Sequence, residues 1–353
     1  MKTHDMAVFI GRFQPLTKGH TEVIRKALDR ADKVVILVGS ANCPRNYYNP
    51  WSFEERKQMI LNAFGHLENA FPNDSSRLII KPIEDSLYNN EKWVKNIQEA
   101  VLEAFVEAKG AWHPLSKVAL IGHSKDNSSF YLKLFPQWDN IEVPNYHDIN
   151  ATDIRNWYFS DQAAYFTKSS TEIPATTRDF LEQFIETPDW QQIKDEYDFV
   201  AKYKKSWEAA PYPPIFVTTD AVVVQSGHIL LVQRGHFPGK GLWALPGGFL
   251  NPGEAIVDGV IRELKEETKI KVPVPVLKGS IVAQRVFDDV HRSSRGRTIT
   301  HSFLFQLNPD HELPKVKGSD DAAFATWVPL SQVTRNMMFE DHKDIIDNLT
   351  ALL

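Results

Sequence analysis

The segment RELKEE, residues 262–267, gathers three carboxylates that could bind a metal ion. In a helix, Glu263, Glu266 and Glu267 stand at positions i, i+3 and i+4 and share one face. Like charges at this spacing repel by roughly a few tenths of a kcal/mol per pair, so we expect a group outside the helix to compensate them. Mg²⁺ takes carboxylate and phosphate oxygens as ligands and can activate water for attack on a phosphoanhydride. A solvated acidic face is the alternative interpretation.

Glycines before this helix extend the pattern. Gly247, Gly248 and Gly253 form a loop that can approach a ligand closely, and we expect the helix to begin near Glu254. Residues 246–270 resemble the Nudix box, which reads Gly, five residues, Glu, seven residues, Arg-Glu-aliphatic-x-Glu-Glu-x-Gly-aliphatic. Lys269 departs from it by replacing the final glycine, although a cation suits a helix C-terminus. The matching residues are Gly248, Glu254, Arg262, Glu263, Leu264, Glu266, Glu267 and Ile270.

The resemblance to Nudix hydrolases covers roughly residues 213–353 and implies cleavage of a nucleoside diphosphate linked to another group. It implies that Glu263, Glu266 and Glu267 hold Mg²⁺ or Mn²⁺. It also implies that Arg262 binds and orients a glutamate, with Glu254 close enough to assist. Glu254 and Glu266 are thus candidate catalytic residues, and the identity of the general base stays open.

The stretch VFDDVHRSSRGRTITHSFLF, residues 286–305, resembles the corresponding part of Nudix proteins directed at ADP-ribose. By that resemblance Arg295, Arg297 and His301 are candidate substrate contacts. The alternative is an exposed turn followed by an ordinary strand.

A second candidate site lies near the amino terminus, in GRFQPLTKGH, residues 11–20. This loop follows an apolar strand and opens a helix, where unpaired N–H groups and the helix dipole favour an anion. His20 in the first helical turn would face a bound phosphate, and Arg12 adds positive charge. The alternative is a plain connection in which His20 caps or packs. The candidate ATP-binding residues here are Gly11, Arg12, Phe13 and Lys18.

Two motifs resemble the nucleotidyltransferase superfamily with H-x-G-H and I-S-x-T-x-x-R signatures. The late motif is INATDIR, residues 149–155, with Thr152 and Arg155 in register and Asn150 in place of serine. The early motif is TKGH, where Thr17 replaces the first histidine. Lys18 or the Thr17 hydroxyl could substitute for that histidine. The resemblance makes His20 and Arg155 candidate catalytic residues.

Further stretches resemble the archaeal-type nicotinamide mononucleotide (NMN) adenylyltransferases: residues 49–56, 84–94 and 121–138. The resemblance implies that Trp93 stacks on nicotinamide, that Asp85 and Asn90 place the nucleotide, and that Arg56 lies near substrate phosphates. For Trp93 the alternative is core packing. The implied reaction is attack by the NMN 5′-phosphate on the α-phosphorus of ATP, which needs positioning and charge neutralisation and no protein nucleophile.

The elements expected to position the first site alternate between strand and helix. This alternation predicts βαβ units with a parallel sheet, and ligands bind such sheets beyond the carboxyl ends of the strands. The predicted strands are 7–10, 34–39, 77–83 and 117–122, and the predicted helices are 19–30, 53–64 and 91–108.

The remaining chain reads as polar helices over 176–208, a proline-rich linker, and then a strand-rich half. We expect an α/β chain: a Rossmann-like nucleotidyltransferase domain over 1–188, a helical segment and linker over 189–212, and an α/β/α Nudix sandwich over 213–353. In the second half the predicted strands are 216–225, 228–234, 281–287, 297–307 and 323–330, and the predicted helix is 254–268.

Composition excludes several classes of function. The 353 residues carry a net charge of −5, so they have no basic excess for a nucleic-acid backbone. Cys43 is the only cysteine, which excludes an intrachain disulfide and a thiolate metal cluster. The sequence contains neither G-x-G-x-x-G after the first strand nor a P-loop. With no secretory or membrane-spanning pattern, we expect a soluble, cytoplasmic protein.

The order of the two motifs resembles bifunctional NMN adenylyltransferase/Nudix proteins over nearly the whole length. It implies synthesis of NAD from ATP and NMN, and metal-dependent hydrolysis of ADP-ribose to AMP and ribose 5-phosphate. The expected partners are these small molecules, without nucleic acid or membrane, and self-association into a homo-oligomer stays open. One alternative is a Nudix module that senses ADP-ribose without cleaving it. Another is a nucleotidyltransferase with a different acceptor.

Overall fold

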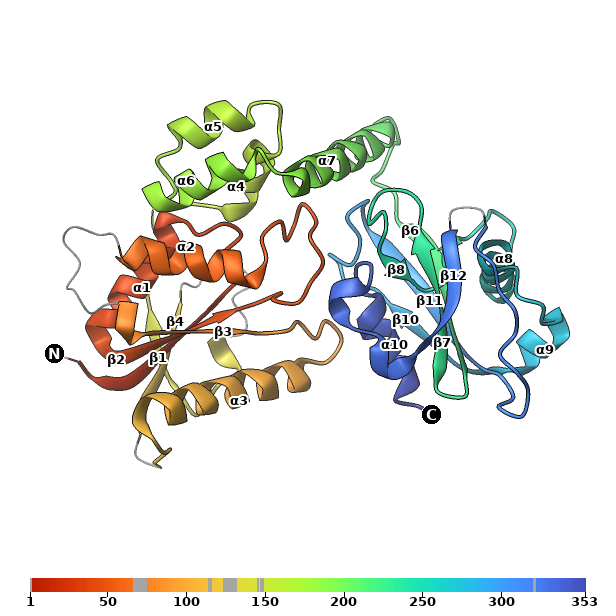
Figure 1. Cartoon of the computed structure of the whole chain (residues 1–353), viewed down its shortest axis with the longest axis horizontal. Coiled ribbons are helices and arrows are strands. Elements are labelled where there is room, and N and C mark those ends of the chain that lie inside the picture. The colour runs from red at the N-terminus through yellow and green to blue at the C-terminus, as the bar shows by residue number, and fades with distance from the viewer. Residues whose placement is uncertain are drawn as a thin grey trace. The chain divides into compact units, whose positions relative to one another are not determined.

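The computed structural model describes residues 2–65, 75–113, 116–122, 132–144, 146, 149–319 and 322–353. These residues divide into two compact units, Met1–Lys194 and Asp195–Leu353 (Figure 1). The division falls inside a helix, α7, which covers much of the segment expected to join the domains. The domain limits 1–188, 189–212 and 213–353 stay predictions.

The first unit contains a parallel sheet with the strand order β3-β2-β1-β4-β5. Helices connect β1 to β2, β2 to β3 and β3 to β4, as the alternating sequence pattern predicts, and the predicted Rossmann-like class is confirmed. The pattern did not predict β5. The elements are β1 His4–Gly11, α1 Lys18–Arg30, β2 Ala31–Val38, α2 Phe53–Gly65, η1 Ser75–Arg77, β3 Leu78–Pro82, α3 Asn90–Lys109, β4 Val118–Gly122 and β5 Asp139–Glu142.

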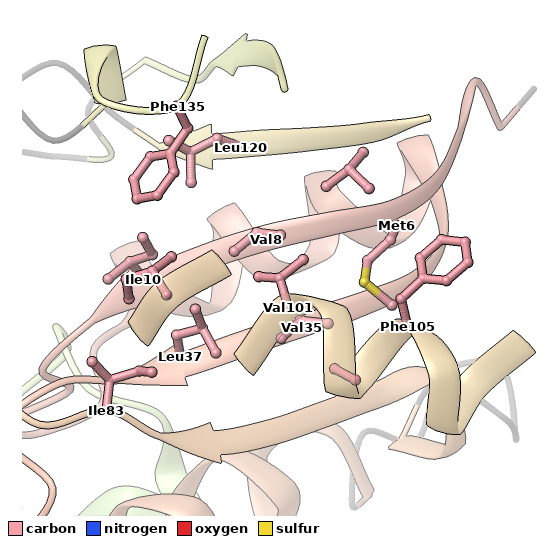
Figure 2. Close-up of a cluster of buried hydrophobic side chains, with 13 residues drawn as sticks. Met6, Val8, Ile10, Val35, Leu37, Ile83, Val101, Phe105, Leu120 and Phe135 are labelled. Carbon is pink, nitrogen blue, oxygen red and sulfur yellow. The ribbon is translucent and has the colours of Figure 1, made fainter. Parts of the chain in front are cut away.

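One face of this sheet is covered by α3, and the strands alternate to meet it. Met6, Val8 and Ile10 of β1 point to this face because successive strand side chains alternate. From α3, Val101 and Phe105 stand one turn apart and pack onto them. Figure 2 shows this cluster between the helix and the strands, while α1 and α2 lie across the opposite face in Figure 1. Because all these strands are parallel, their carboxyl ends meet at one edge of the sheet.

Helices follow the sheet in the first unit. The two polar helices predicted over 176–208 are confirmed as α6 and α7, whereas α4 and α5 were not predicted. The bounds are α4 Ala151–Tyr158, α5 Ala163–Ser169, α6 Ala175–Phe184 and α7 Pro188–Ser206.

The second unit contains a mixed sheet with the order β10-β11-β6-β7-β12, in which β8 pairs with β7 and β9 with β6. The β6–β11 pair is parallel and the other pairs are antiparallel. The elements are β6 Phe216–Gln225, β7 His228–Arg234, β8 Trp243–Ala244, β9 Gly247–Phe249, α8 Ile256–Thr268, α9 Val274–Gly279, β10 Ile281–Phe287, β11 Thr298–Gln306, β12 Ala322–Pro329, η3 Leu330–Gln332, η4 Arg335–Met337 and α10 His342–Thr350.

The layers of this unit follow from the apolar faces of its helices. Val260, Ile261 and Leu264 of α8 are buried against Ala221 and Val223 of β6. In Figure 1, α10 covers the other face of the sheet, where it packs on β10 and β11. The predicted α/β/α sandwich is confirmed. Of its helices, α9 and α10 were not predicted.

The end of α8 explains how the chain tolerates lysine where the Nudix pattern has glycine. Lys269 is the C-cap, with φ +49° and ψ +27°, and its N–H donates to the Lys265 carbonyl. This left-handed conformation favours glycine because a Cβ crowds the backbone. The loop geometry of the pattern is therefore kept, with backbone strain at Lys269.

Replacing Lys269 by glycine should stabilise the second unit by about 0.5–1 kcal/mol, because the left-handed C-cap position suits glycine. Calorimetric unfolding of the full chain would measure this as a rise in the transition of that unit. The matched control is Lys265→Gly in the last helical turn, which should destabilise by about 1 kcal/mol. Equal losses from both variants would contradict strain at Lys269.

Candidate functional site

The loop after β1 is shaped by aromatic packing. Phe13 has φ +53°, an uncommon value for a residue other than glycine, and is 1% exposed. Its ring lies edge-on to Phe9 with centroids 5.3 Å apart, and 4.9 Å from the His20 imidazole. Gly11 ends β1 immediately before this turn. Phe13, predicted to bind ATP, thus supports the position of His20 in this structure.

Two buried arginines hold the backbone of the same loop. Arg56 is 0% exposed, and its Nη1 donates to the carbonyl oxygens of Arg12 at 2.8 Å and Gly39 at 2.7 Å. Arg155 is buried too, and its Nη1 donates to the Gln14 carbonyl at 2.6 Å. Because backbone carbonyls use these donors, both arginines position the loop. The predicted contact of Arg56 with substrate phosphates stays a prediction.

Positive charge accumulates around this loop. Burial lowers the pKa of Arg56 to about 10 and that of Arg155 to about 10, and the nearby charge of Arg12 acts in the same direction on both. The Arg12 side chain is exposed. The two buried guanidinium groups of Arg56 and Arg155 thus lie near the exposed side chain of Arg12. This arrangement is suited to a polyanion such as a triphosphate.

His20 is oriented by the residue that departs from the family signature. Thr17 is the N-cap of α1, and its Oγ1 accepts the His20 N–H at 3.3 Å. In return, His20 Nδ1 accepts the Thr17 backbone N–H at 3.0 Å. An N–H can only donate, so Nδ1 carries no proton and the neutral ring keeps its proton on Nε2. Thr17 therefore fixes His20 as an Nε2–H donor.

The late motif is arranged in a similar way. Asn150, which replaces the signature serine, caps α4 by accepting the Thr152 N–H at 3.0 Å. The Thr152 hydroxyl accepts a hydrogen bond from Arg155 Nη2 at 3.1 Å. Thr152 and Arg155 are thus brought together, as their spacing in the motif predicts.

The remaining predicted nucleotide contacts lie at or after strand ends. Asp85 accepts hydrogen bonds from the Ser40 N–H at 3.3 Å and the Ser40 hydroxyl at 2.5 Å, which ties the loop after β2 to the loop after β3. Lys18 and Asn90 are exposed at the first positions of α1 and α3.

Trp93 in the first turns of α3 is half-buried. It packs against the core cluster of Figure 2 and lies 6.2 Å from the Phe135 ring, measured between centroids. The core-packing alternative is thus seen, while stacking on nicotinamide stays a prediction. Part of the predicted stretch 121–138 lies outside the described residues, because these omit 123–131.

In the second unit, Arg262 is the centre of an ionic network on α8. Its Nε and Nη2 donate to both carboxylate oxygens of Glu254 at 2.8 and 3.1 Å. Its Nη1 donates to Glu263 at 2.8 Å and to Glu266 at 2.9 Å. These bonds, with Glu254 first, raise the pKa of Arg262, and the Arg262 bond lowers the pKa of Glu254. Arg262, a residue of the same helix, thus compensates Glu263 and Glu266, while compensation from outside the helix stays a prediction.

Glu267 has a different environment from its neighbours. It is 8% exposed, and its Oε2 accepts the Gly247 N–H at 3.0 Å. Burial raises the pKa of Glu267 to about 8, and the negative charge of Glu263 adds to this effect. A Cβ at Gly248 would lie 2.6 Å from Glu263 Oε1, so a larger residue there would displace this carboxylate. The glycine loop thus closes over the acidic face.

These residues line a cavity of about 450 Å³. Glu263, Glu266 and Glu267 form one side together with Arg262. Asp220, Arg292, Arg295, Glu340 and His342 also line it, from segments far apart in the sequence. The cavity is of the size that a small ligand occupies.

Comparisons with known proteins match each unit to a different family. A Cytidylyltransferase-like model matches residues 8–173, and a NUDIX domain model matches residues 215–349. A nicotinamide/nicotinic acid mononucleotide adenylyltransferase of Acinetobacter baylyi is 36% identical over 198 residues, which are 56% of this chain and 95% of the relative. An ADP-ribose pyrophosphatase of Methanocaldococcus jannaschii is 33% identical over 130 residues, 37% of this chain and 70% of the relative.

A solved structure covers both units. The bifunctional NMN adenylyltransferase/ADP-ribose pyrophosphatase of Francisella tularensis, in complex with AMP and a manganese ion, is 37% identical with a TM-score of 0.88, and the match covers 99% of each chain. The chain belongs to this bifunctional family. Both resemblances predicted from the motifs are thereby confirmed.

In this bifunctional family member, the sequence motifs did not indicate the other charged residues that line the cavity, apart from Arg295. Arg292 pairs with Asp341 through two bonds of 2.9 and 3.0 Å. His342 Nδ1 accepts the Leu245 N–H at 2.9 Å, and burial lowers the pKa of His342 to about 3. Glu340 has φ +42°, a strained value of the kind found at functional sites. No local motif signals these residues, because the fold assembles them from separate segments.

The predicted contacts after β10 separate in the structure. Arg295 lines the cavity and lies over the Phe249 ring, with Cζ 4.9 Å from the centroid. Arg297 instead donates from Nη1 to the carbonyl oxygens of Asp288 and Asp289 in its own loop. His301 Nδ1 lies 3.1 Å from Gln284 Nε2 on the neighbouring strand. Arg297 and His301 are not among the cavity-lining residues, and their substrate contacts stay predictions.

The donor set on α8 fits a hard divalent cation. Glu263, Glu266 and Glu267 offer oxygen ligands of the kind that Mg²⁺ and Mn²⁺ prefer. Among the residues that the structure describes, no group of three or more histidine, cysteine, aspartate or glutamate side chains is arranged to hold a metal ion. Glu263 and Glu266 are instead bonded to Arg262, and Glu267 to a backbone N–H. The assignment of Glu263, Glu266 and Glu267 as metal ligands therefore stays a prediction.

Within the described part of the chain, none of the helices combines the length and the apolar character that crossing a bilayer requires.

His20 should remain neutral in the ligand-free chain at pH 5 and above. Burial lowers its pKa to about 4, so the proton leaves well below the ordinary value near 6.5. NMR of the imidazole nitrogens should show the Nε2–H form from pH 5 to 8, with His20→Gln to assign the signals. A protonation midpoint between pH 6 and 7, or an Nδ1–H form, would contradict the role derived for Thr17.

Proposed function

We propose that this chain makes NAD from ATP and NMN in its first unit and hydrolyses ADP-ribose in its second. The carrying observation is that each unit holds its own charged site. One is positive and suits a triphosphate, and the other is acidic and suits a metal-bound diphosphate. The match to the Francisella tularensis enzyme over 99% of both chains supports both activities in one polypeptide.

Adenylyl transfer requires positioning more than covalent catalysis. The NMN 5′-phosphate attacks the α-phosphorus of ATP, a new P–O bond forms, and pyrophosphate leaves. His20, held as an Nε2–H donor, and exposed Arg12 are the groups that would bind the phosphates where negative charge develops. Arg56 and Arg155 hold the loop that presents them. A preorganised loop limits the reorganisation needed during the reaction.

ADP-ribose hydrolysis needs a nucleophilic water at a diphosphate. Glu263, Glu266 and Glu267 would hold Mg²⁺ or Mn²⁺, which when bound polarises the phosphate and lowers the pKa of water. Arg262 would keep Glu254 and Glu266 oriented, and Arg295, which lines the same cavity, would bind negative charge on the substrate. The products would be AMP and ribose 5-phosphate.

The non-hydrolysing sensor is not favoured as an alternative. A sensor has no need of the full carboxylate set, whereas this chain keeps Glu254, Glu263 and Glu266 paired with Arg262 and has Glu267 in the same cavity. Incubating the full chain with ADP-ribose and Mn²⁺ and measuring AMP tests the assignment. Tight binding without AMP would favour the sensor.

Replacing Glu266 by glutamine should lower ADP-ribose hydrolysis by at least about 100-fold, because the amide loses the anionic ligand that a divalent cation prefers. NAD synthesis should be unchanged. Both products can be quantified by chromatography from the same protein preparation. Glu312→Gln, an exposed glutamate that does not line the cavity, is the matched control and should leave both activities intact.

Replacing His20 by alanine should lower the kcat of NAD synthesis by about 100- to 1000-fold, the usual loss when one donor to a developing charge is removed. ADP-ribose hydrolysis should persist. The assay measures NAD from ATP with NMN and, in parallel, with its deamidated form, and His113→Ala at an exposed position serves as control. If His20→Ala or Glu266→Gln abolishes both activities in a folded protein, the two sites are not independent.

A further inference from the structure

The carboxyl-terminal half of α7 belongs to the second unit, although it precedes the matched NUDIX domain at residue 215. Glu196 is 7% exposed, and its Oε2 accepts the Gly239 N–H at 2.9 Å. Val200, one turn further along, is 2% exposed. This part of the helix is therefore built into the unit by a buried polar contact and a buried apolar side chain.

The same face of α7 also reaches the cavity. Phe199 and Tyr203 stand one turn apart, beside Glu196 and Val200, and both line the cavity that contains the α8 carboxylates. Phe199 is 38% exposed, and its ring centroid lies 6.4 Å from that of Phe237. Both rings therefore present aromatic surface to a cavity that otherwise holds many charged groups.

Short contacts connect this aromatic surface with the acidic face. The Tyr203 ring lies 5.9 Å from Phe216, and Phe216 lies 5.7 Å from Phe249, measured between centroids. The Phe249 carbonyl accepts a hydrogen bond from Arg262 Nη2 at 3.2 Å. The cavity therefore has an aromatic part and a charged part, which are connected through the rings of Phe216 and Phe249. A nucleoside diphosphate has the same division between base and phosphates.

We propose that Phe199 and Tyr203 of α7 recognise the purine base of the nucleoside diphosphate hydrolysed in the second unit. This inference rests on the proposed hydrolysis of ADP-ribose. The flat purine stacks on the exposed aromatic surface, while its diphosphate lies among Arg262, Arg295 and the carboxylates. Helix α7 is thus a specificity element of the hydrolase as well as a connection between two domains.

The test uses the full chain with Phe199→Ala, Tyr203→Ala and the double variant. The KM for ADP-ribose should rise roughly 5- to 100-fold, as expected for loss of base stacking, with a much smaller change in kcat. The KM for UDP-ribose, whose smaller pyrimidine stacks less, should change little, so the preference for purine over pyrimidine falls. Phe199→Tyr should keep the wild-type preference, and Lys202→Ala, an exposed change on the same helix, should leave all parameters unchanged.

Calorimetric binding of ADP-ribose and UDP-ribose in metal-free buffer separates recognition from turnover. If wild type forms no AMP but the variants lose ADP-ribose binding selectively, the proposed hydrolysis fails and the base-recognition proposal stands. Equal losses on both nucleotides would overturn the base-recognition proposal, since they indicate a structural role. Unchanged KM and binding in the double variant would overturn it as well. A calorimetric unfolding transition of the second unit at the wild-type temperature confirms that each variant is folded.

Discussion

Repulsion between like charges must be balanced at both sites before any substrate binds, and the two units balance it in different ways. In the first unit, the buried Arg56 and Arg155 donate to backbone carbonyls. Since no carboxylate accepts these bonds, the bonds leave the positive charge of both arginines in place next to Arg12. In the second unit, Arg262 binds Glu254, Glu263 and Glu266 directly. Carbonyl oxygens are only partial charges, so the first site keeps its affinity for anions. A full countercharge such as Arg262 leaves the carboxylates ordered and close together, where an incoming cation can compete for them.

The local sequence predicts most of what depends on periodicity. The β1 to β4 strands and α8 follow from alternating or helical apolar patterns, and the Nudix spacing placed Arg262 among its glutamates. The sequence interpretation did not include the countercharge from Arg262, whose long side chain reaches the residues one and four positions ahead and Glu254 before it. Compensation by a cation from outside the helix stays a prediction. Spacing indicates which residues share a face, but the path of a flexible side chain depends on packing. Short elements such as β5 and α5 carry too few residues for a periodic signal.

Most of the residues of the hydrolase cavity that lie outside α8 could not be predicted from motifs. Asp220 comes from β6, Arg292 from the loop after β10, and His342 from the start of α10. Each is ordinary in its local sequence, and it is the folded sheet that brings them within one cavity. Thr17 shows the reverse situation, in which a departure from a motif has a clear structural reason. Its hydroxyl and backbone N–H cap the helix and set the protonated nitrogen of His20, so the position contributes through His20 even without an imidazole of its own.

Helix α7 is another element whose contacts in the folded chain differ from what its sequence pattern indicates. Its proline-rich sequel and polar composition favour a linker, and the matched NUDIX domain begins only at residue 215. Yet Glu196 is buried and its carboxylate accepts the Gly239 N–H, so this half of the helix makes a polar contact within the second unit. A segment that must pack there anyway can place aromatic rings in the cavity at little additional entropic cost. Base recognition by a helix outside the Nudix motif would let related chains differ in nucleotide preference while the α8 carboxylates stay the same.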